Sequence, residues 1–169
     1  MESSVSRPHM PGYGVLPAEE GTGLLPWSWV EERLIRSHDY WLATVTPSGA
    51  PHLMPVWAVW YGAKLWFSSS ISSRKTRNLA EEARCTISTE EPLEPVVVSG
   101  QAEPVTNHSD LEAMIAAVNA KYGTDYTLEM VDPVVNSVYA MTPEWVFALD
   151  SNDFVGSPTR FTFTGPPSQ

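Results

Sequence analysis

Three cationic residues, Arg74, Lys75 and Arg77, lie within four consecutive positions, directly after a serine-rich segment at residues 68–73. The chain of 169 residues has only ten lysines and arginines against twenty aspartates and glutamates, so this local concentration of positive charge is unusual. Serine hydroxyls, unpaired N–H groups at a helix start and nearby cations together favour a bound anion. Cations in a first turn are unfavourable for the helix dipole. We therefore expect a phosphate-bearing ligand here, and a solvated helix start is the alternative.

Few other side chains suggest chemistry. His52 follows a predicted turn, where it is either a proton donor to a ligand or, as we favour, a solvent-exposed histidine. Arg160 either meets an anionic partner or forms an ion pair with one of the many acids. No residue can be assigned as a catalytic acid or base, and no acids have metal-ligand spacing, so we expect no metal. The single cysteine, Cys85, excludes an internal disulfide framework and is interpreted as a small buried hydrophobe.

The basic cluster is positioned by a strand and a helix. Residues 64–69 are apolar and β-favouring, and a helix is expected from about residue 73 to 83, with Ser72 or Ser73 as its N-cap. Two strands at 40–46 and 51–61 precede them and complete an antiparallel meander. Pro55 within the second of these strands requires an edge position or a bulge.

The remaining pattern indicates more strands and two helices. One helix is expected at 26–37, with Ser28 and Glu31 as a capping box, and a second at 107–122, capped by Asn107 and ended by Gly123. Gly100 suggests a bulge in its strand. Further strands are expected at 84–90, 95–106, 134–142, 144–150 and 159–164. Six or more short strands with helices outside the meander predict a small β-barrel of the mostly β, or α+β, class.

The composition limits the organisation and partners of the chain. We expect a flexible N-terminal arm at residues 1–23, one cofactor-binding domain at 24–164 and a C-terminal tail at 165–169. A net charge of −10 argues against nucleic acid or an anionic membrane surface as the main partner. No run is apolar enough for a membrane span and no secretory leader is evident, so a cytoplasmic location is expected.

Several segments, taken in order, resemble a known family. They are PHLMPVWAVWYGAKLWFSSSISSRKTRNLAEEARCTIS at 51–88, PVVVSGQAEPVT at 95–106 and TRFTF at 159–163. This order is similar to that of the pyridoxamine 5′-phosphate oxidase-like split-barrel superfamily, and within it to the B group of flavin/deazaflavin oxidoreductases, over residues 25–163. The resemblance implies a six-stranded antiparallel split β-barrel with flanking helices. It also implies a homodimer with cofactor grooves at the interface.

The resemblance further implies which residues bind a cofactor. The phosphate would be held at the end of the strand and the start of the helix, and the tricyclic ring would lie along the preceding strand. The implied cofactor-binding residues are Met54, Pro55, Val56, Trp57, Ala58, Ser68, Ser69, Ser73, Arg74, Lys75, Arg77 and Asn78. Trp57 either stacks on the ring or fills the barrel, and we favour the barrel. Arg77 contacts phosphate, contacts a polyglutamate tail, or lies on the helix surface; His52 and Arg160 are further candidates for substrate or tail contacts.

The implied function is that of an oxidoreductase using coenzyme F420, a reduced deazaflavin, to transfer hydride to a small unsaturated or conjugated substrate. One alternative is an FMN-binding split-barrel oxidase or reductase, and another is a non-catalytic protein that binds or sequesters flavin, deazaflavin or haem. The sequence departs from the pyridoxamine phosphate oxidases in two places. Residues 53–60 contain no arginine, and no histidine follows His108, so vitamin B6 oxidation is disfavoured.

Overall fold

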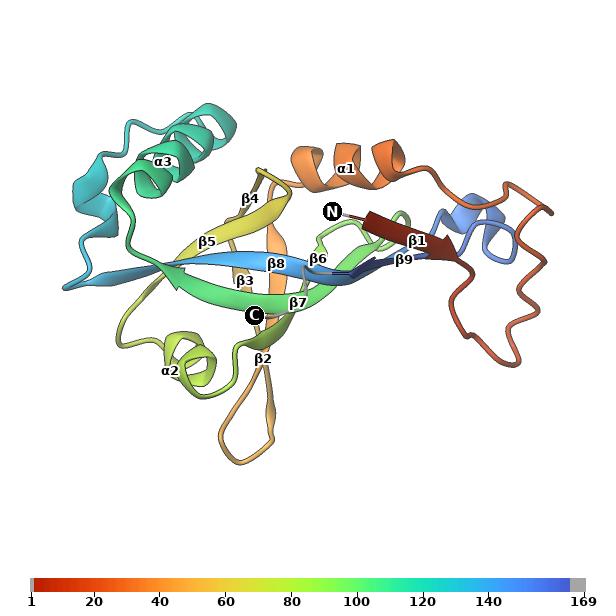
Figure 1. The fold of residues 1–169 in the computed structure, drawn as a ribbon, viewed down its shortest axis with the longest axis horizontal. Coiled ribbons are helices and arrows are strands. Elements are labelled where there is room, and N and C mark those ends of the chain that lie inside the picture. Colours follow the sequence, from red (N-terminus) through yellow and green to blue (C-terminus); the bar gives the residue numbers. More distant parts are fainter. Residues whose placement is uncertain (1, 165–169) are drawn as a thin grey trace.

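The structure is a computed structural model that describes residues 2–164. Its main feature is one antiparallel sheet flanked by three helices (Figure 1). The strands are β1 (Glu2–Ser6), β2 (Tyr40–Val45), β3 (Pro51–Val56), β4 (Val59–Tyr61), β5 (Lys64–Ser70), β6 (Arg84–Thr89), β7 (Val96–Val105), β8 (Asn136–Ala148) and β9 (Thr159–Thr164). The helices are α1 (Trp27–Arg36), α2 (Arg74–Glu81) and α3 (His108–Tyr122), with short 3-10 helices η1 (Leu128–Val131) and η2 (Ser151–Asp153). These elements confirm the predicted mostly β, α+β class.

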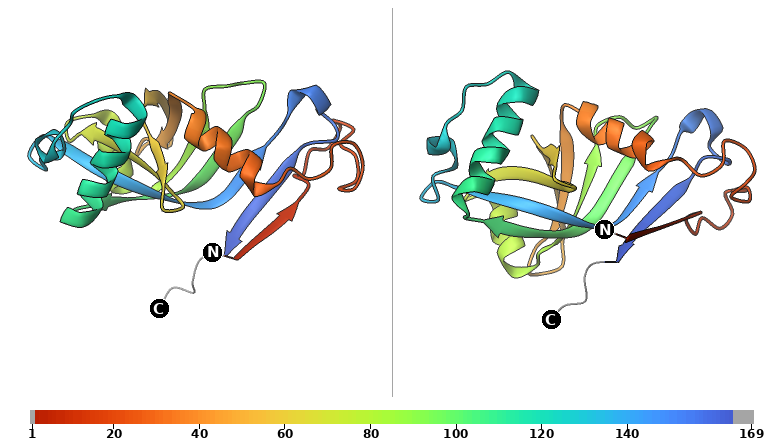
Figure 2. Two further views of the ribbon diagram at one scale, coloured as in Figure 1. Left: turned by 90° about the horizontal axis from the view of Figure 1, so that it is seen from above. Right: turned by 45° about the horizontal axis from the view of Figure 1, so that its top comes forward.

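Strand β8 divides the sheet because one of its edges pairs with two different strands. One edge pairs with β7, whereas the other pairs with β5 over its first half and with β9 over its second half. Beyond β7 the sheet continues through β6 and β2 to β3; β4 follows β5, and β1 follows β9. This division is the arrangement expected of a split barrel, with nine strands within residues 2–164 in place of the six that were expected. In Figures 1 and 2 the helices α1 and α3 lie on one side of the strands, and α2 lies on the other.

Two buried clusters of apolar side chains hold the strands together. Because successive residues of a strand point to opposite faces, β5 contributes to both clusters. Phe67 belongs to the larger cluster inside the curved sheet, which also contains Leu42 and Ile87. Trp66 belongs to the smaller cluster, which includes Met114 of helix α3. The β5 strand therefore ties the main core to the layer under α3.

The two predicted long helices are present, with one correction at a cap. Asn107 caps α3 as predicted, since its side chain accepts hydrogen bonds from the next helical N–H groups, and Gly123 ends the helix in the left-handed conformation. Helix α1 begins after Pro26, and no side chain caps it, so the predicted capping box of Ser28 and Glu31 is wrong. Glu31 instead accepts a hydrogen bond of 2.9 Å from the indole nitrogen of Trp60, which draws its carboxylate away from the helix start.

Two predicted strand boundaries also differ. The predicted strand at 51–61 is interrupted after Val56, because β3 pairs with β2 whereas β4 pairs with β5. The strands predicted at 134–142 and 144–150 form the single strand β8. The predicted bulge at Gly100 is confirmed by a register shift between Ser99 and Gly100 opposite β8. A side chain at Gly100 would collide with the backbone of Thr142, so only glycine fits there.

The N-terminal residues are held against the C-terminal strand, although the sequence suggested a flexible arm at 1–23. Strand β1 pairs with β9 throughout its length. The Arg7 side chain donates hydrogen bonds to six backbone carbonyls, and these carbonyls lie within residues 16–23 and 156–158. The sequence did not predict this attachment, because hydrogen bonds from a polar side chain to distant backbone carbonyls leave no periodic pattern in the sequence. The predicted tail at 165–169 lies outside the described residues.

Candidate functional site

Helix α2 begins in a network of hydroxyl groups. Ser73 is the N-cap, as one of the two predicted alternatives, and its hydroxyl accepts a hydrogen bond of 3.1 Å from the backbone N–H of Thr76. The Ser73 hydroxyl also lies 2.8 Å from that of Ser69, at the end of β5. The Thr76 hydroxyl donates to the carbonyl of Ser70. The turn between β5 and α2 is therefore fixed by its own side chains.

The cations of this turn remain available to a ligand. Arg74 and Arg77 are exposed and Lys75 is half-buried. Within residues 2–164, none of the three forms an ion pair, although acids outnumber bases in the chain. The backbone N–H groups of Arg74 and Lys75 also have no acceptor within that range. Unpaired cations beside free N–H groups fit an anion such as a phosphate.

Asn78 lies inside the protein, in contrast to its predicted role as a ligand contact. Its side chain is only 2% exposed, and its amide nitrogen donates a 2.9 Å hydrogen bond to the hydroxyl of Thr44 in β2. The same hydroxyl lies 3.4 Å from the ring nitrogen Nδ1 of His52 in β3. Asn78 therefore fixes α2 against the strands, and this brings the basic helix start and the half-buried His52 to the same end of the sheet.

The two serines predicted to act together lie on opposite faces of β5. Ser69 is buried and bonds to the α2 cap, as described above. Ser68 is paired in register with Val138, which belongs to the cluster under α3. Because directly opposed residues share a face, Ser68 points toward that cluster. Only Ser69 of this pair is thus part of the α2 turn.

Strand β3 is the terminal strand on its side of the sheet. Its outer edge has no strand partner within the described residues, so the outward-facing backbone groups of this strand are open to a ligand or to another chain. Pro55 is exposed, as its predicted edge position requires, and Val56 is buried. Ala58 differs from the prediction, because its N–H donates to the Tyr122 hydroxyl and its carbonyl accepts from Lys121 and Tyr122. The backbone groups of Ala58 are therefore already used within the protein.

Trp57 does not fill the barrel, so the favoured prediction for this residue is wrong. Its side chain is 43% exposed and stacks on the ring of Tyr122, with ring centres 4.3 Å apart and planes 4° from parallel. The ring of His38 meets both aromatic rings edge-on. The break between β3 and β4 turns Trp57 outward onto α3, and alternation within a single strand could not predict this break.

Arg160 lies away from the α2 turn. It is exposed on β9, in register with Ser6 and Phe147. Its guanidinium carbon is 5.7 Å from the ring centre of Trp145, within range of a cation–π interaction. The structure therefore does not bring Arg160 together with Arg74 and Lys75.

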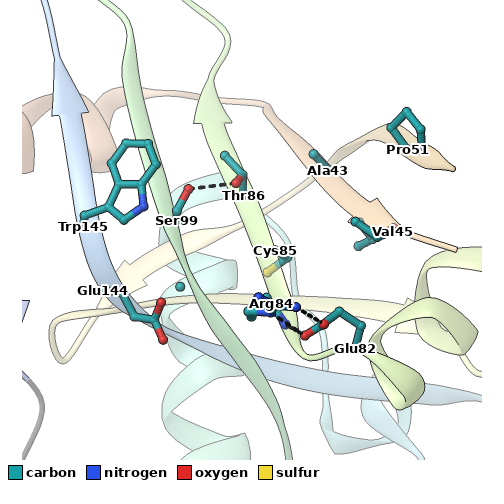
Figure 3. Close-up of a pocket in the computed structure, with 12 residues that line it drawn as sticks. Ala43, Val45, Pro51, Glu82, Arg84, Cys85, Thr86, Ser99, Glu144 and Trp145 are labelled. Carbon is teal, nitrogen blue, oxygen red and sulfur yellow. Dashed lines mark hydrogen bonds and ion pairs between the residues drawn. The ribbon is translucent and has the colours of Figure 1, made fainter. Parts of the chain in front are cut away.

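The outer face of the sheet carries a recess of about 580 Å³ (Figure 3). Its floor is a row of residues from four neighbouring strands: Ala43, Thr86, Ser99 and Trp145. None of the predicted cofactor-binding residues lines it. At one end Arg84 donates to Glu82, and this bond lowers the pKa of the Glu82 carboxyl to about 2. The recess was not predicted from the sequence. The alternation of apolar and polar residues along these strands does mark the side chains of its floor as outward-facing.

The described residues show neither a metal site nor a membrane span. Cys85 is buried, as predicted, and burial raises the pKa of its thiol to about 12. Within residues 2–164, no three histidine, cysteine or acidic side chains are placed to hold a metal ion. No helix in this part of the chain is both long and apolar enough to cross a membrane.

Comparison with known families decides the classification. The sequence model of the family "Pyridoxamine 5′-phosphate oxidase" matches residues 30–150, which include β2 to β8 and both sides of the α2 turn. The chain belongs to this family. Its members share the split-barrel fold that the division of the sheet at β8 shows here. No curated protein matches this chain in sequence.

Solved structures of similar fold include proteins of several kinds. An F420 reductase is 25% identical with a TM-score of 0.57, over 69% of this chain and 94% of that protein. A conserved hypothetical protein from Mycobacterium tuberculosis is 23% identical with a TM-score of 0.66, over 76% and 87% of the two chains. A haem binding protein from Mycobacterium smegmatis is 24% identical with a TM-score of 0.55, over 79% and 62%. The last two likenesses concern the fold alone.

Proposed function

We propose that this family member is an oxidoreductase that binds coenzyme F420 at the start of α2 and reduces a small unsaturated or conjugated substrate. The observation that carries the proposal is the unpaired positive charge of Arg74, Lys75 and Arg77 in a chain of net charge −10. Arg74 and Lys75 precede Asn78 by four and three positions, so both lie on the part of the helix next to the residue that faces β2. The phosphate of the cofactor would lie between this turn and β3.

Two features favour the deazaflavin over FMN. Residues 53–60 lack the arginine that pyridoxamine phosphate oxidases carry on this strand, and one similar protein, 25% identical, is an F420 reductase. FMN remains the alternative cofactor, because both groups share a tricyclic ring and a phosphate. Vitamin B6 oxidation is not proposed, because no histidine follows His108.

The residues of the chain would bind and orient the cofactor. When bound, the deazaflavin supplies the hydride, so the protein needs no acid or base of its own for that transfer. Arg74 and Lys75 would hold the phosphate with charge-assisted hydrogen bonds, and the open edge of β3 would position the ring. The exposed face of Trp57 would lie beside the substrate region. His52, held beside Thr44, would be the nearest titratable group at this end of the sheet.

We further propose a homodimer formed through the outer face of the sheet. Trp41, Val45 and Leu53 are exposed on β2 and β3. Val45 lines the recess of Figure 3, and Leu53 is paired in register with Ala43 of its floor. A contiguous apolar surface of this kind is uncommon on a monomer and is usually covered by a partner. A second copy would cover this face, and the interface would extend to the open edge of β3, where the cofactor ring is proposed to lie.

A titration with two cofactors tests the cofactor proposal. Tryptophan fluorescence of the purified protein is followed as F420 or FMN is added. We expect tight binding of F420 and weak binding of FMN, followed by oxidation of reduced F420 when a suitable acceptor is added. The opposite preference would replace the proposal with an FMN enzyme. Tight binding without turnover of any acceptor would indicate a sequestering protein.

A double variant, Arg74→Ala with Lys75→Ala, tests the site. Each charge-assisted hydrogen bond is worth about 1.5–3 kcal/mol, so loss of both should weaken F420 binding by about a hundredfold or more. Both side chains reach the surface and form no ion pair within residues 2–164, so the thermal midpoint should stay nearly unchanged. Arg84→Ala removes a cation elsewhere and serves as the matched control. Normal F420 binding by the double variant would refute the site.

A further inference from the structure

A second cavity lies on the other side of the sheet from α2. It has a volume of about 450 Å³ and is bounded by the end of α1, by β4 and by α3. Figure 1 shows β4 between these two helices. The apolar part of its wall consists of Ile35, Val59, Trp60, Ala117 and Ala120. This volume is in the range of pockets that enclose a small organic molecule.

Lys121 lines the same cavity, and two hydrogen bonds to buried residues behind the wall hold its side chain in place. Its ammonium nitrogen donates to the Tyr40 hydroxyl at 2.7 Å and to the carbonyl of Ala58 at 2.9 Å. The Tyr40 hydroxyl in turn donates to the carbonyl of Leu34, so it faces Lys121 with a lone pair. A lysine ammonium has three donors, and these contacts use two of them. One N–H of Lys121 has no acceptor among the described residues.

The positive charge of Lys121 has no close counter-ion, unlike that of Arg36 in the same wall. The Arg36 guanidinium donates to Glu94 at 2.8 Å, and His38 lies 3.0 Å from the carboxylate of Asp39. Within residues 2–164, no carboxylate lies within 4.0 Å of Lys121. The surroundings therefore offer one uncompensated positive charge next to an apolar wall.

The partial burial of Lys121 also indicates that its charge is poorly compensated. Burial lowers the pKa of Lys121 to about 8, and the more distant Glu90 and Asp39 act in the opposite direction. Tyr122, which also faces this region, stays neutral because burial raises its pKa to about 12. Lys121 is therefore mostly charged near pH 7, and an anion that entered the cavity would compensate a charge that is expensive to bury.

We propose that the cavity between α1 and α3 binds a small organic monocarboxylate, with its carboxylate on Lys121 and its apolar body against Val59, Trp60 and Ala117. A ligand with one negative charge fits this site, because only one cation of the wall lacks a close counter-ion. This site is separate from the α2 turn, since none of its lining residues belongs to that turn, and its one link to the predicted cofactor set is the bond from Lys121 to the carbonyl of Ala58. The proposal therefore does not depend on the identity of the cofactor.

Calorimetric titration of the full chain with octanoate and with phenylpropionate tests the proposal. The corresponding neutral amides, octanamide and phenylpropionamide, are the ligand controls. A charge-assisted hydrogen bond to a carboxylate should make each acid bind about tenfold or more tightly than its amide. Equal binding of acid and amide, or no saturable binding of either acid up to millimolar concentration, would overturn the proposal.

Four variants locate the binding. Lys121→Met keeps the length of the side chain and should weaken binding of the acids by about tenfold or more, whereas Lys64→Met should leave it unchanged. Ala120→Phe fills the cavity from an exposed helix position and should abolish binding of the acids. It tests the site independently if Lys121→Met fails to fold. The double variant Arg74→Ala with Lys75→Ala should bind the acids normally. Acid binding that survives Lys121→Met and Ala120→Phe but is lost in the double variant would place the anion at α2 and refute this site.

Discussion

At the scale of single residues, Asn78 connects the basic turn to the sheet. It is buried, and Thr44 is its one side-chain partner among the described hydrogen bonds. Asn78→Ala leaves the Thr44 hydroxyl without this donor, so we expect a loss of about 1–3 kcal/mol in the free energy of unfolding. Urea unfolding measures this loss. Arg77→Ala, an exposed change in the same helix, should stay within about 0.5 kcal/mol of the unmodified protein. Equal midpoints for the Asn78 variant and the unmodified protein would contradict this role.

Lys121 gives the stability a dependence on pH that can be isolated. Its pKa falls from 10.5 to about 8 on folding, so between these values the unfolded chain binds more protons than the folded one. Stability should therefore rise with pH across this interval, and the gain should be absent from Lys121→Met. Urea unfolding of both proteins at several pH values measures the difference, in which the tyrosines common to both largely cancel. A difference independent of pH would show that Lys121 keeps its ordinary pKa.

At the scale of elements, Arg7 joins two segments that are far apart in sequence. Its donors reach carbonyls of the loop before α1 and of the loop before β9. Arg7→Met should lower the free energy of unfolding by about 2–3 kcal/mol, because several partly buried carbonyls lose a charged donor. Thermal or urea unfolding tests this, with Arg160→Met as a control that removes an exposed arginine. Unfolding at the same midpoint in both variants would show that the two loops are stable without the hydrogen bonds of Arg7.

The elements also show what a sequence can predict. The helix 107–122 and the cap at Ser73 follow from local side-chain chemistry, and both were predicted. The break between β3 and β4 follows instead from which strand each half pairs with, and this depends on residues far along the chain. Strand β1 was missed for the same reason, because its partner β9 lies at the other end of the described chain.

At the scale of the whole molecule, the apolar outer face leads to a prediction about assembly. Trp41→Ser combined with Leu53→Lys places a polar group and a charge at the proposed interface, since both residues are about half exposed there, at 44% and 56%. We expect the unmodified protein to be a dimer by light scattering and the double variant to be a monomer. Val134→Lys, at an exposed site in the loop between η1 and β8, should remain dimeric. A monomeric unmodified protein at micromolar concentration would refute the interface.

The candidate site was only partly predictable. Arg74 and Lys75 were found because their charge stands out in an acidic chain, and the structure leaves them unpaired within residues 2–164. Asn78 and Ser68 were included by resemblance, but the face to which each side chain points depends on packing. Lys121 gave no signal in the sequence, because its environment is created by Tyr40 and Ala58, which are more than sixty positions away.

The pairing of β1 with β9 has a consequence for biosynthesis. Among the described strands, β1 leaves the ribosome before all the others and β9 leaves after them, so β1 has no partner while the strands between them are being made. Contacts between such distant segments form late, because their closure costs the most chain entropy. The second half of the β8 edge stays open until β9 pairs with it, and only then does β1 find its partner on the other edge of β9.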